Sequence, residues 1–260
     1  MTTTDTATPT ALGVGAAAGT ESGTPRAWLT RLLLNPRSRT VQRDLRNIAD
    51  LHRTVMNLVP DGLGPDPRAQ AGVLFRLETD TVGAPVVLVQ TRMPPTPDRL
   101  PEGYADAAVR PMDALLNALR PGLLLRYRIA ANAVRRCGPQ STAGRWKQAI
   151  PLRGPEADQW WIERATPAGL APRTVLSRAA DNASTWHTPR PTDTASSAPP
   201  AQPAPTNQGG RRIDRAVTLF EGTAAVIDPE ALANALMNGI GRSKSYGCGL
   251  LSLAPAGPGA

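Results

Sequence analysis

Apolar side chains recur along the first half of the chain with two different periods, which predict strands and helices in a definite order. Residues 28–34 place apolar side chains on both faces, as in a central strand. Residues 41–59 place them at helical spacing, and a cap at Asn47 predicts that the helix restarts at Ile48, after a separate turn at 41–46. The elements predicted next are strands at 73–78 and 86–91, a short helix at 112–119 and a strand at 123–131. This order of strand, helix, strand, strand, helix and strand is that of a ferredoxin-like unit.

The second half predicts a similar unit with less regular spacing. A basic, turn-rich stretch at 135–152 fits a hairpin, and an amphipathic helix follows at 155–164. The remaining predicted elements are a strand at 174–180, a strand or bulged strand pair at 217–220 and 223–227, a helix at 229–238 and a last strand at 250–253. The predicted fold class is therefore α+β, with two tandem ferredoxin-like (βαββαβ, RRM-like) domains.

Three segments lack the large apolar residues that an ordered core needs. They are the Thr/Ala/Gly-rich start at 1–25, a Pro/Thr/Ser/Ala-rich insert at about 185–210, and the tail at 256–260. We expect these segments to be disordered. The predicted domains are then 26–132 and 133–255, with the insert inside the second.

Composition narrows the class of partner. The net charge is +8 and the sequence pI about 10.6, which favours a polyanionic partner, although abundant Ala, Gly, Pro and Arg would also follow from GC-rich codons. Aromatic residues make up only 4% of the chain, which argues against RNA binding by bases stacked on a sheet. Two cysteines without metal-like spacing and the lack of a signal peptide or membrane span predict a cytoplasmic protein.

The most distinctive stretch is a glycine-rich loop at 239–249, between the predicted last helix and the last strand. Asp228-Pro229 marks the start of that helix and Gly239 its end. Exposed backbone N–H groups together with Arg242 and Lys244 would form a cradle for phosphate. The loop lacks the spacing of a Walker or dinucleotide-binding loop, and composition alone fits a flexible connection equally well.

Histidine is the side chain best suited to proton transfer near neutral pH. The chain has two, and His187 falls in the predicted disordered insert. His52 is therefore the candidate for proton transfer, although a histidine on an apolar helical stripe is more often a satisfied core residue.

Beyond these patterns, the chain resembles the CasE-type CRISPR repeat endoribonucleases of type I-E Cascade over roughly residues 28–255. The resemblance is most specific at Gly239-Ile240-Gly241, Ser243-Lys244 and the run from Gly247 to Pro255. It is supported, in the same order along the chain, by segments 29–36, 43–45, 51–54, 73–78, 87–90, 125–132 and 219–222. The resemblance implies two ferredoxin-like domains, recognition of a CRISPR repeat stem-loop and cleavage at the base of the stem without a metal or other cofactor.

The resemblance also implies partners and site residues. The enzyme would remain on its crRNA hairpin as a Cascade subunit, next to the backbone subunit nearest the crRNA 3′ end. His52 would be catalytic, while a tyrosine found three residues earlier in some relatives is replaced by Ala49. This replacement leaves open whether His52 acts as base, acid or both. Ser243 and Lys244 are candidates for stabilising the transition state.

Basic residues and loop glycines make up the predicted RNA-binding surface. The candidates are Arg126, Arg128, Arg135, Arg136, Arg145, Lys147, Gly239, Gly241, Arg242, Gly247 and Gly249. Two other functions remain open. A non-catalytic subunit would hold an RNA hairpin on the same surface, and an assembly subunit would make no RNA contacts. A catalytic role of His52 would distinguish an enzyme from the non-catalytic RNA-binding subunit. The Arg-rich region 135–153 argues against the assembly subunit without RNA contacts.

Overall fold

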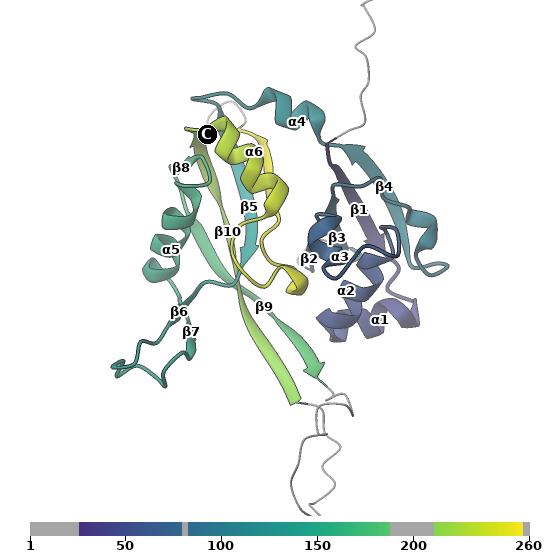
Figure 1. The fold of residues 1–260 in the computed structure, drawn as a ribbon, viewed down its shortest axis with the longest axis horizontal. Coiled ribbons are helices and arrows are strands. Elements are labelled where there is room, and N and C mark those ends of the chain that lie inside the picture. The colour runs from purple at the N-terminus through teal and green to yellow at the C-terminus, as the bar shows by residue number, and fades with distance from the viewer. Residues whose placement is uncertain (1–25, 80–82, 188–210, 257–260) are drawn as a thin grey trace, which may run out of the picture.

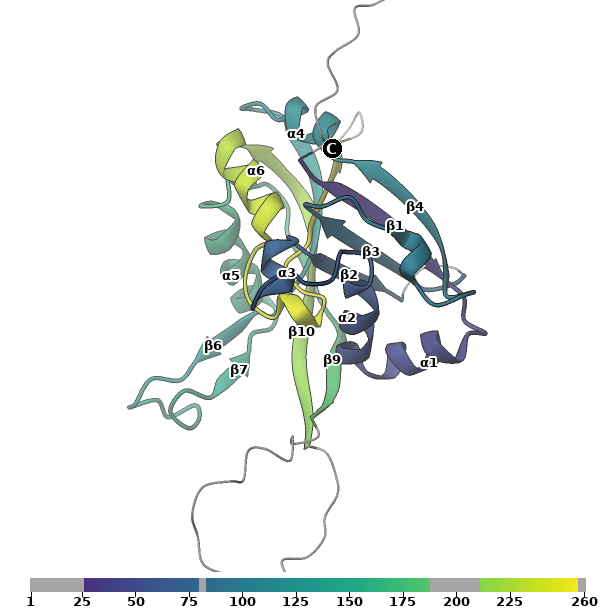
Figure 2. The ribbon, with the colours of Figure 1, turned by 45° about the vertical axis from the view of Figure 1, so that its right-hand side comes forward.

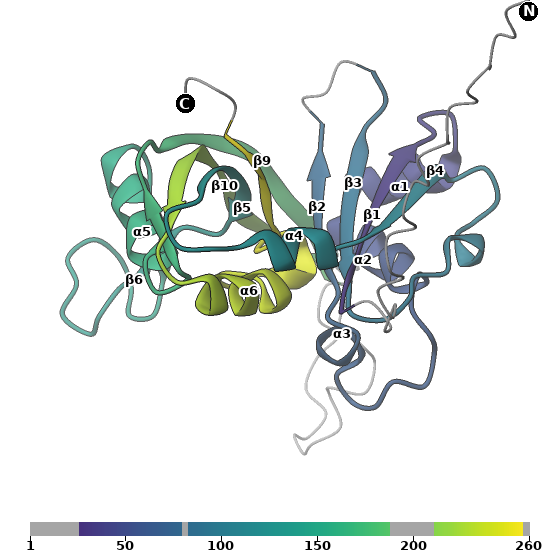
Figure 3. The same cartoon turned by 90° about the horizontal axis from the view of Figure 1, so that it is seen from above.

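The computed structural model describes residues 26–79, 83–187 and 211–256, which form two antiparallel sheets side by side (Figures 1 and 3). The expected tail at 1–25, and most of the expected insert and of the tail at 256–260, lie outside the described residues. Both sheets carry helices in the arrangement of tandem ferredoxin-like domains, so the predicted fold class is confirmed. In the described part of the chain, no helix is long and apolar enough to cross a membrane.

The first sheet has the strand order β2-β3-β1-β4. Its strands are β1 (Trp28–Leu34), β2 (Leu74–Glu78), β3 (Val86–Thr91) and β4 (Ala105–Pro111). Three helices lie between β1 and β2: α1 (Arg39–Arg46), α2 (Ile48–Met56) and α3 (Pro67–Gln70). Where a ferredoxin-like unit has its second helix, between β3 and β4, the chain forms only the short 3₁₀ helix η1 (Pro97–Arg99).

The predicted fourth strand of this unit was wrong. Residues 105–111 form that strand, which lies at an exposed edge of the sheet and has no apolar stripe that would mark it in the sequence. The short helix α4 (Asp113–Ala118) was found but connects the two sheets, and β5 (Leu124–Ala131) starts the second sheet. The strands therefore change sheet between β4 and β5, before the expected domain boundary at 132/133.

The second sheet has the order β11-β5-β10-β8, with β9 also paired to β10. Its strands after β5 are β8 (Leu170–Pro172), β9 (Leu176–His187), β10 (Arg211–Val226) and β11 (Leu251–Pro255). Both crossover helices are present here, α5 (Pro155–Ala165) and α6 (Pro229–Asn238). A two-stranded hairpin of β6 (Val134–Arg136) and β7 (Ala149–Pro151) projects from this unit, as predicted (Figure 2).

The strands β9 and β10 extend further than the apolar pattern indicated. β10 is one strand whose pairing register shifts between Arg215 and Val217. The backbone of His187 ends β9 opposite Arg211, so the prediction that residues 185–187 belong to the insert was wrong. A long two-stranded ladder continues past the apolar core, which is why hydrophobicity alone places its end too early.

Two apolar cores support the two sheets. The first contains α1 and α2 packed on β1–β3, but it also includes Ala130, Val217, Leu219 and Cys248 of the second unit. The second core joins α4, α5 and α6 to β5 and β10. Because the first core draws on both units, burial of apolar surface holds the two sheets against each other.

Candidate active site and nucleic-acid interface

Two sets of polar contacts hold the helix that carries His52, one at its start and one near its end. The side chain of Asn47 accepts a hydrogen bond from the backbone N–H of Ala49 at 3.2 Å, which caps α2 and confirms the predicted restart at Ile48. The preceding residues 41–46, predicted as a turn, lie within the helix α1. Asp44 of α1 is fully buried and accepts hydrogen bonds from Thr54 of α2 at 2.6 Å and from Tyr104 at 2.9 Å. Because breaking a buried network of this kind is costly, α2 has one orientation on the sheet.

His52 lies half-buried on α2, and its ring stacks on Phe75 of β2 with centroids 6.0 Å apart. Its Nε2 atom is buried and has no hydrogen-bond partner among the described residues. Burial and the positive charges of Arg68 and Arg53 lower the pKa of His52 from its ordinary value of 6.5. The imidazole is therefore neutral at pH 7, which is the form that accepts a proton.

The glycine-rich loop is held between the two units. Asp228 caps α6 by accepting hydrogen bonds from the N–H groups of Glu230 and Ala231, as predicted, and the helix ends at Gly239. The C-terminal carbonyls of α6 are bound by β3 and the residue after it: Gln90 donates to Leu236 at 2.8 Å and Arg92 donates to Met237 at 3.2 Å. The loop thus starts from a helix end that β3 fixes in place.

Within the loop, three of the four predicted RNA-binding glycines face protein: Gly247, which lies against Phe75, and Gly239 and Gly249. A Cβ on Gly239 would lie 2.8 Å from Leu74 and 2.9 Å from the carbonyl of Gly249, and a Cβ on Gly249 would lie 2.9 Å from the carbonyl of Ile240. The N–H of Ile240 also donates to Gly249 at 3.0 Å. These contacts give Gly239 and Gly249 a role in closing the loop on itself. Gly241 and Arg242 are exposed, and they remain open to a ligand.

Phe75 brings the loop and His52 together. A Cβ on Gly247, where φ is 78°, would lie 3.3 Å from the Phe75 ring, whose neighbour on α2 is His52. The helix α2 also contacts the short 3₁₀ helix η3 (Lys244–Tyr246) within the loop. The candidate catalytic histidine comes from the first unit, and the loop that approaches it comes from the second.

Cationic side chains gather at this meeting point. Burial and the charge of Arg68 lower the pKa of Lys244, so Arg68 acts on both Lys244 and His52. Arg68 is half-buried on α3, and its guanidinium donates to the carbonyl of Val73, next to β2, at 3.2 Å. Ser243 precedes η3 in the left-handed conformation, with φ 62° and ψ 34°. An anion placed here would meet positive charge from both units.

Sequence reasoning missed Arg68, Phe75 and Arg76. Phe75 and Arg76 were predicted only as strand residues, and Arg68 falls in a Gly/Pro/Asp-rich region with no periodicity. The alternation of β2 was the available signal, because it places the neighbours Phe75 and Arg76 on opposite faces of the strand. Their contacts confirm this arrangement, since Phe75 meets His52 while Arg76 meets the second sheet.

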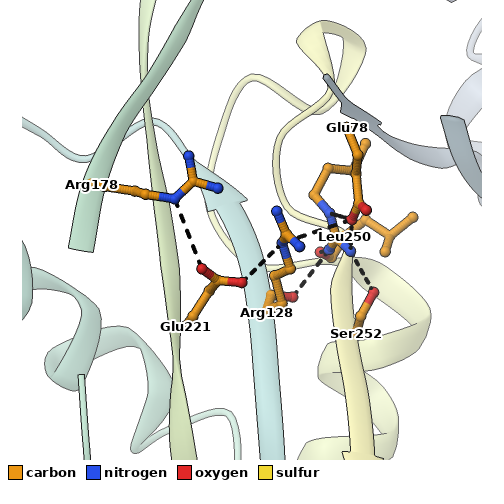
Figure 4. A network of polar contacts seen from close by, with 7 residues as sticks. Glu78, Arg128, Arg178, Glu221, Leu250 and Ser252 are labelled. Atoms are coloured by element: carbon orange, nitrogen blue, oxygen red, sulfur yellow. Dashed lines mark hydrogen bonds and ion pairs between the residues drawn. The ribbon is translucent and has the colours of Figure 1, made fainter. Parts of the chain in front are cut away.

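Arg76 is 2% exposed and connects the two units through its guanidinium. It donates to Glu78 at 2.7 and 3.0 Å, to the carbonyls of Arg128 and Leu250 at 3.1 and 3.0 Å, and to the hydroxyl of Ser252 at 2.9 Å. Figure 4 shows that the network continues through Arg128 to Glu221 and Arg178. Arg76 thereby links β2, which carries Phe75, to both β5 and β11.

The predicted RNA-contacting cations fall into two groups. Arg128, at 28% exposure, forms ion pairs with Glu221 at 3.2 Å and with Glu78 at 3.8 Å, so it belongs to the network between the units. Arg126 on β5 and the cations of the β6–β7 hairpin are exposed instead. The hairpin cations are Arg135, Arg136, Arg145 and Lys147, and Arg135 lies 3.5 Å from Glu156 at the surface, where such a pair is weak.

No group of three or more His, Cys, Asp and Glu side chains is arranged to hold a metal ion in the ranges that the structure describes. Both cysteines are buried and free, and burial raises the pKa of Cys248 to about 12. The resemblance implies cleavage without a metal ion. This stays a prediction, because a cleavage assay is what tests it.

Comparison with known proteins agrees with this geometry. Residues 27–255 match a protein-family model described as "CRISPR associated protein". The CRISPR-associated endoribonuclease Cse3 of Thermus thermophilus is 34% identical over 245 residues, covering 88% of this chain and all of the relative. A structure of Thermus thermophilus Cse3 bound to an RNA representing a pre-cleavage complex has a TM-score of 0.66 at 32% identity, again covering 88% of this chain and all of that one. A chain of a CRISPR RNA-guided surveillance complex has a TM-score of 0.58, 32% identity and the same coverage.

Proposed function

The chain belongs to the CRISPR-associated protein family, and we propose that it is an endoribonuclease that binds the CRISPR repeat stem-loop and cleaves precursor crRNA. The full-length relative is named for this class of activity, and a solved structure of that relative holds RNA before cleavage. Of the alternatives that the sequence left open, an assembly subunit without RNA contacts fits less well with the RNA-bound structures of the relative.

The surroundings of His52 carry the catalytic part of the proposal. His52 is kept neutral by its surroundings, its buried Nε2 atom has no partner among the described residues, and it lies beside Phe75, which the glycine-rich loop approaches. A buried polar atom without a partner is costly in a folded protein unless a ligand satisfies it. The exposed hairpin cations and the loop of the second unit supply the RNA-binding surface.

In this proposal RNA supplies its own nucleophile. His52 accepts the proton of the 2′-hydroxyl, the oxygen of that hydroxyl forms a bond to phosphorus, and the bond from phosphorus to the 5′-oxygen breaks. The departing 5′-oxygen takes a proton either from the protonated His52 or from water, in which case His52 releases its proton to the solvent. The lowered pKa of His52 favours the role of base, which the sequence left open. Lys244 and Ser243 stabilise the negative charge on the phosphorus oxygens.

The proposal extends to assembly and location. After cleavage the protein stays on the crRNA hairpin and joins a Cascade complex in the cytoplasm, in contact with the backbone subunit nearest the crRNA 3′ end. A similar chain in an RNA-guided surveillance complex supports the membership of an assembly. The neighbouring subunit is an inference from the resemblance.

The chemistry of the products tests the proposal. Purified protein is incubated with repeat RNA from its own genome, with and without excess EDTA, and both new ends are identified. We expect a 2′,3′-cyclic phosphate on the upstream product, a 5′-hydroxyl on the downstream product and no effect of EDTA on the rate. A 5′-phosphate, or a rate that disappears with chelator and returns with Mg²⁺, would show that a metal-activated water is the nucleophile.

A further inference from the structure

Trp146 differs from the other tryptophans whose side chains the structure describes. Trp161 is fully buried against Tyr127 and Phe220, Trp28 is 9% exposed, and Trp160 stacks on Phe220 with centroids 5.9 Å apart. Trp146 is 63% exposed, in the loop that joins β6 to β7. An indole ring presents a large apolar surface, so leaving it in water has a cost that a binding partner would remove.

The loop around Trp146 has a defined frame. Beyond the last β6–β7 pair, the N–H of Cys137 donates to Gln148 and the N–H of Lys147 donates to Cys137, each at 2.9 Å. Gly144 lies against the buried sulfur of Cys137, where a Cβ would come within 3.2 Å. Trp146 directly precedes the closing residue, Lys147, which has a left-handed φ of 63°. Its ring is thus presented from a closed turn.

The surroundings of Trp146 select the class of partner. The ammonium group of Lys147 lies 4.1 Å from the centroid of the Trp146 ring, and Arg135, Arg136 and Arg145 are exposed on the same hairpin. Residues 132–154 contain no Asp or Glu. An exposed ring in a purely cationic segment matches a partner that combines negative charge with flat apolar surfaces, which is the chemistry of a nucleic acid.

We propose that Trp146 is a base-stacking residue that binds an unpaired nucleotide of the RNA while the hairpin cations hold the adjoining phosphates. The inference rests on the proposed function and adds to it a contact that depends on base stacking rather than on charge. Unpaired bases are the part of an RNA hairpin whose faces an aromatic ring can reach, because the bases of a stem are already stacked. The nucleotide lies either in the terminal loop of the hairpin or in a single-stranded flank.

The salt dependence of binding separates stacking from charge. The Kd for the cleaved hairpin RNA is measured over a range of salt for the wild type, Trp146→Leu, Trp146→Phe and Arg135→Gln/Arg136→Gln. We expect Trp146→Leu to weaken binding roughly 5- to 150-fold, the range for loss of one stacked base, with an unchanged salt slope. Trp146→Phe keeps a ring and should recover most of the affinity. The double arginine variant should flatten the slope by about 1 for each lost phosphate contact.

Controls distinguish the possible failures. Ile162→Ala removes an exposed apolar side chain (37%) from α5, outside the hairpin, and should bind RNA as the wild type does. If Trp146→Leu flattens the salt slope as well, the ring serves to fold the hairpin and the proposal is wrong. An unchanged Kd in Trp146→Leu also overturns it, while failure of the wild type to bind would instead overturn the proposed function. Two further RNAs identify the nucleotide that stacks on Trp146: one lacks the single-stranded flanks, and the other has abasic sites in its terminal loop. The difference in Kd between the wild type and Trp146→Leu should disappear with the RNA that lacks the stacked base.

Discussion

The two ferredoxin-like units differ in what surrounds the same strand order. In the first, the second crossover helix is reduced to η1, and the helices between β1 and β2 carry His52. In the second, both crossover helices are complete, and the cationic hairpin and the glycine-rich loop are added to them. One unit therefore supplies the proposed proton acceptor and the other most of the proposed RNA-binding surface. The proposed active site therefore lies where the two units meet, at Phe75 and Gly247.

The division of roles makes the link between the units a point of weakness. We expect Arg76→Met to lower the free energy of unfolding by about 3–5 kcal/mol, because it removes the nearest cation from Glu78 and the donor from the carbonyls of Arg128 and Leu250. Arg178→Met changes an arginine 42% exposed in the same network and should cost less than about 1 kcal/mol. Denaturant unfolding of both variants measures the difference, and equal losses would show that Arg76 does not join the units.

Gly247→Val tests the contact between the loop and Phe75. A β-branched residue at φ 78° is strained by about 1–3 kcal/mol, and here it also pushes on the ring that stacks on His52. Gly122→Val is the matched control, since φ is 79° but no atom lies within 4 Å of the added Cβ. Both variants should lose stability in thermal unfolding, Gly247→Val more because it also meets Phe75, while only Gly247→Val should lower the single-turnover cleavage rate at a temperature where both remain folded. Equal cleavage by the two variants would remove Phe75 from the site.

The pH dependence of cleavage tests the neutral state of His52. Its lowered pKa means that the free enzyme keeps the proton-accepting form at a pH where an ordinary histidine is charged. The acid limb of kcat/KM should therefore have its midpoint below 6.5 and be absent from the residual activity of His52→Gln. The free energy of unfolding changes with pH in the same direction. Because the unfolded chain binds the proton of His52 more readily than the folded protein does, the contribution of His52 to stability falls as the pH drops through 6.5. A midpoint above 6.5 would show that His52 is not the neutral base of the free enzyme.

The sequence predicted the elements that carry a strong apolar period or a cap. The restart of α2 at Ile48 and the start of α6 after Asp228 were both confirmed. The edge strand β4 was missed because its side chains face solvent, and the extension of β9 to His187 was missed because it lies beyond the core. His52 was identified by elimination and by resemblance, whereas Arg68 and Phe75 depend on tertiary contacts between segments that no local pattern connects.

We propose that proton transfer and most of the RNA binding are carried by different units, and one paired measurement tests this division. The single-turnover cleavage rate at saturating protein and the Kd for the cleaved hairpin are determined for His52→Ala and for Arg135→Gln/Arg136→Gln. We expect His52→Ala to lower the rate roughly 10²- to 10⁴-fold with Kd close to the wild-type value, since one neutral imidazole adds little phosphate affinity. The arginine variant should weaken Kd and leave the saturated rate nearly unchanged. Full cleavage by a folded His52→Ala variant, or equal effects of both variants on rate and Kd, would contradict the account.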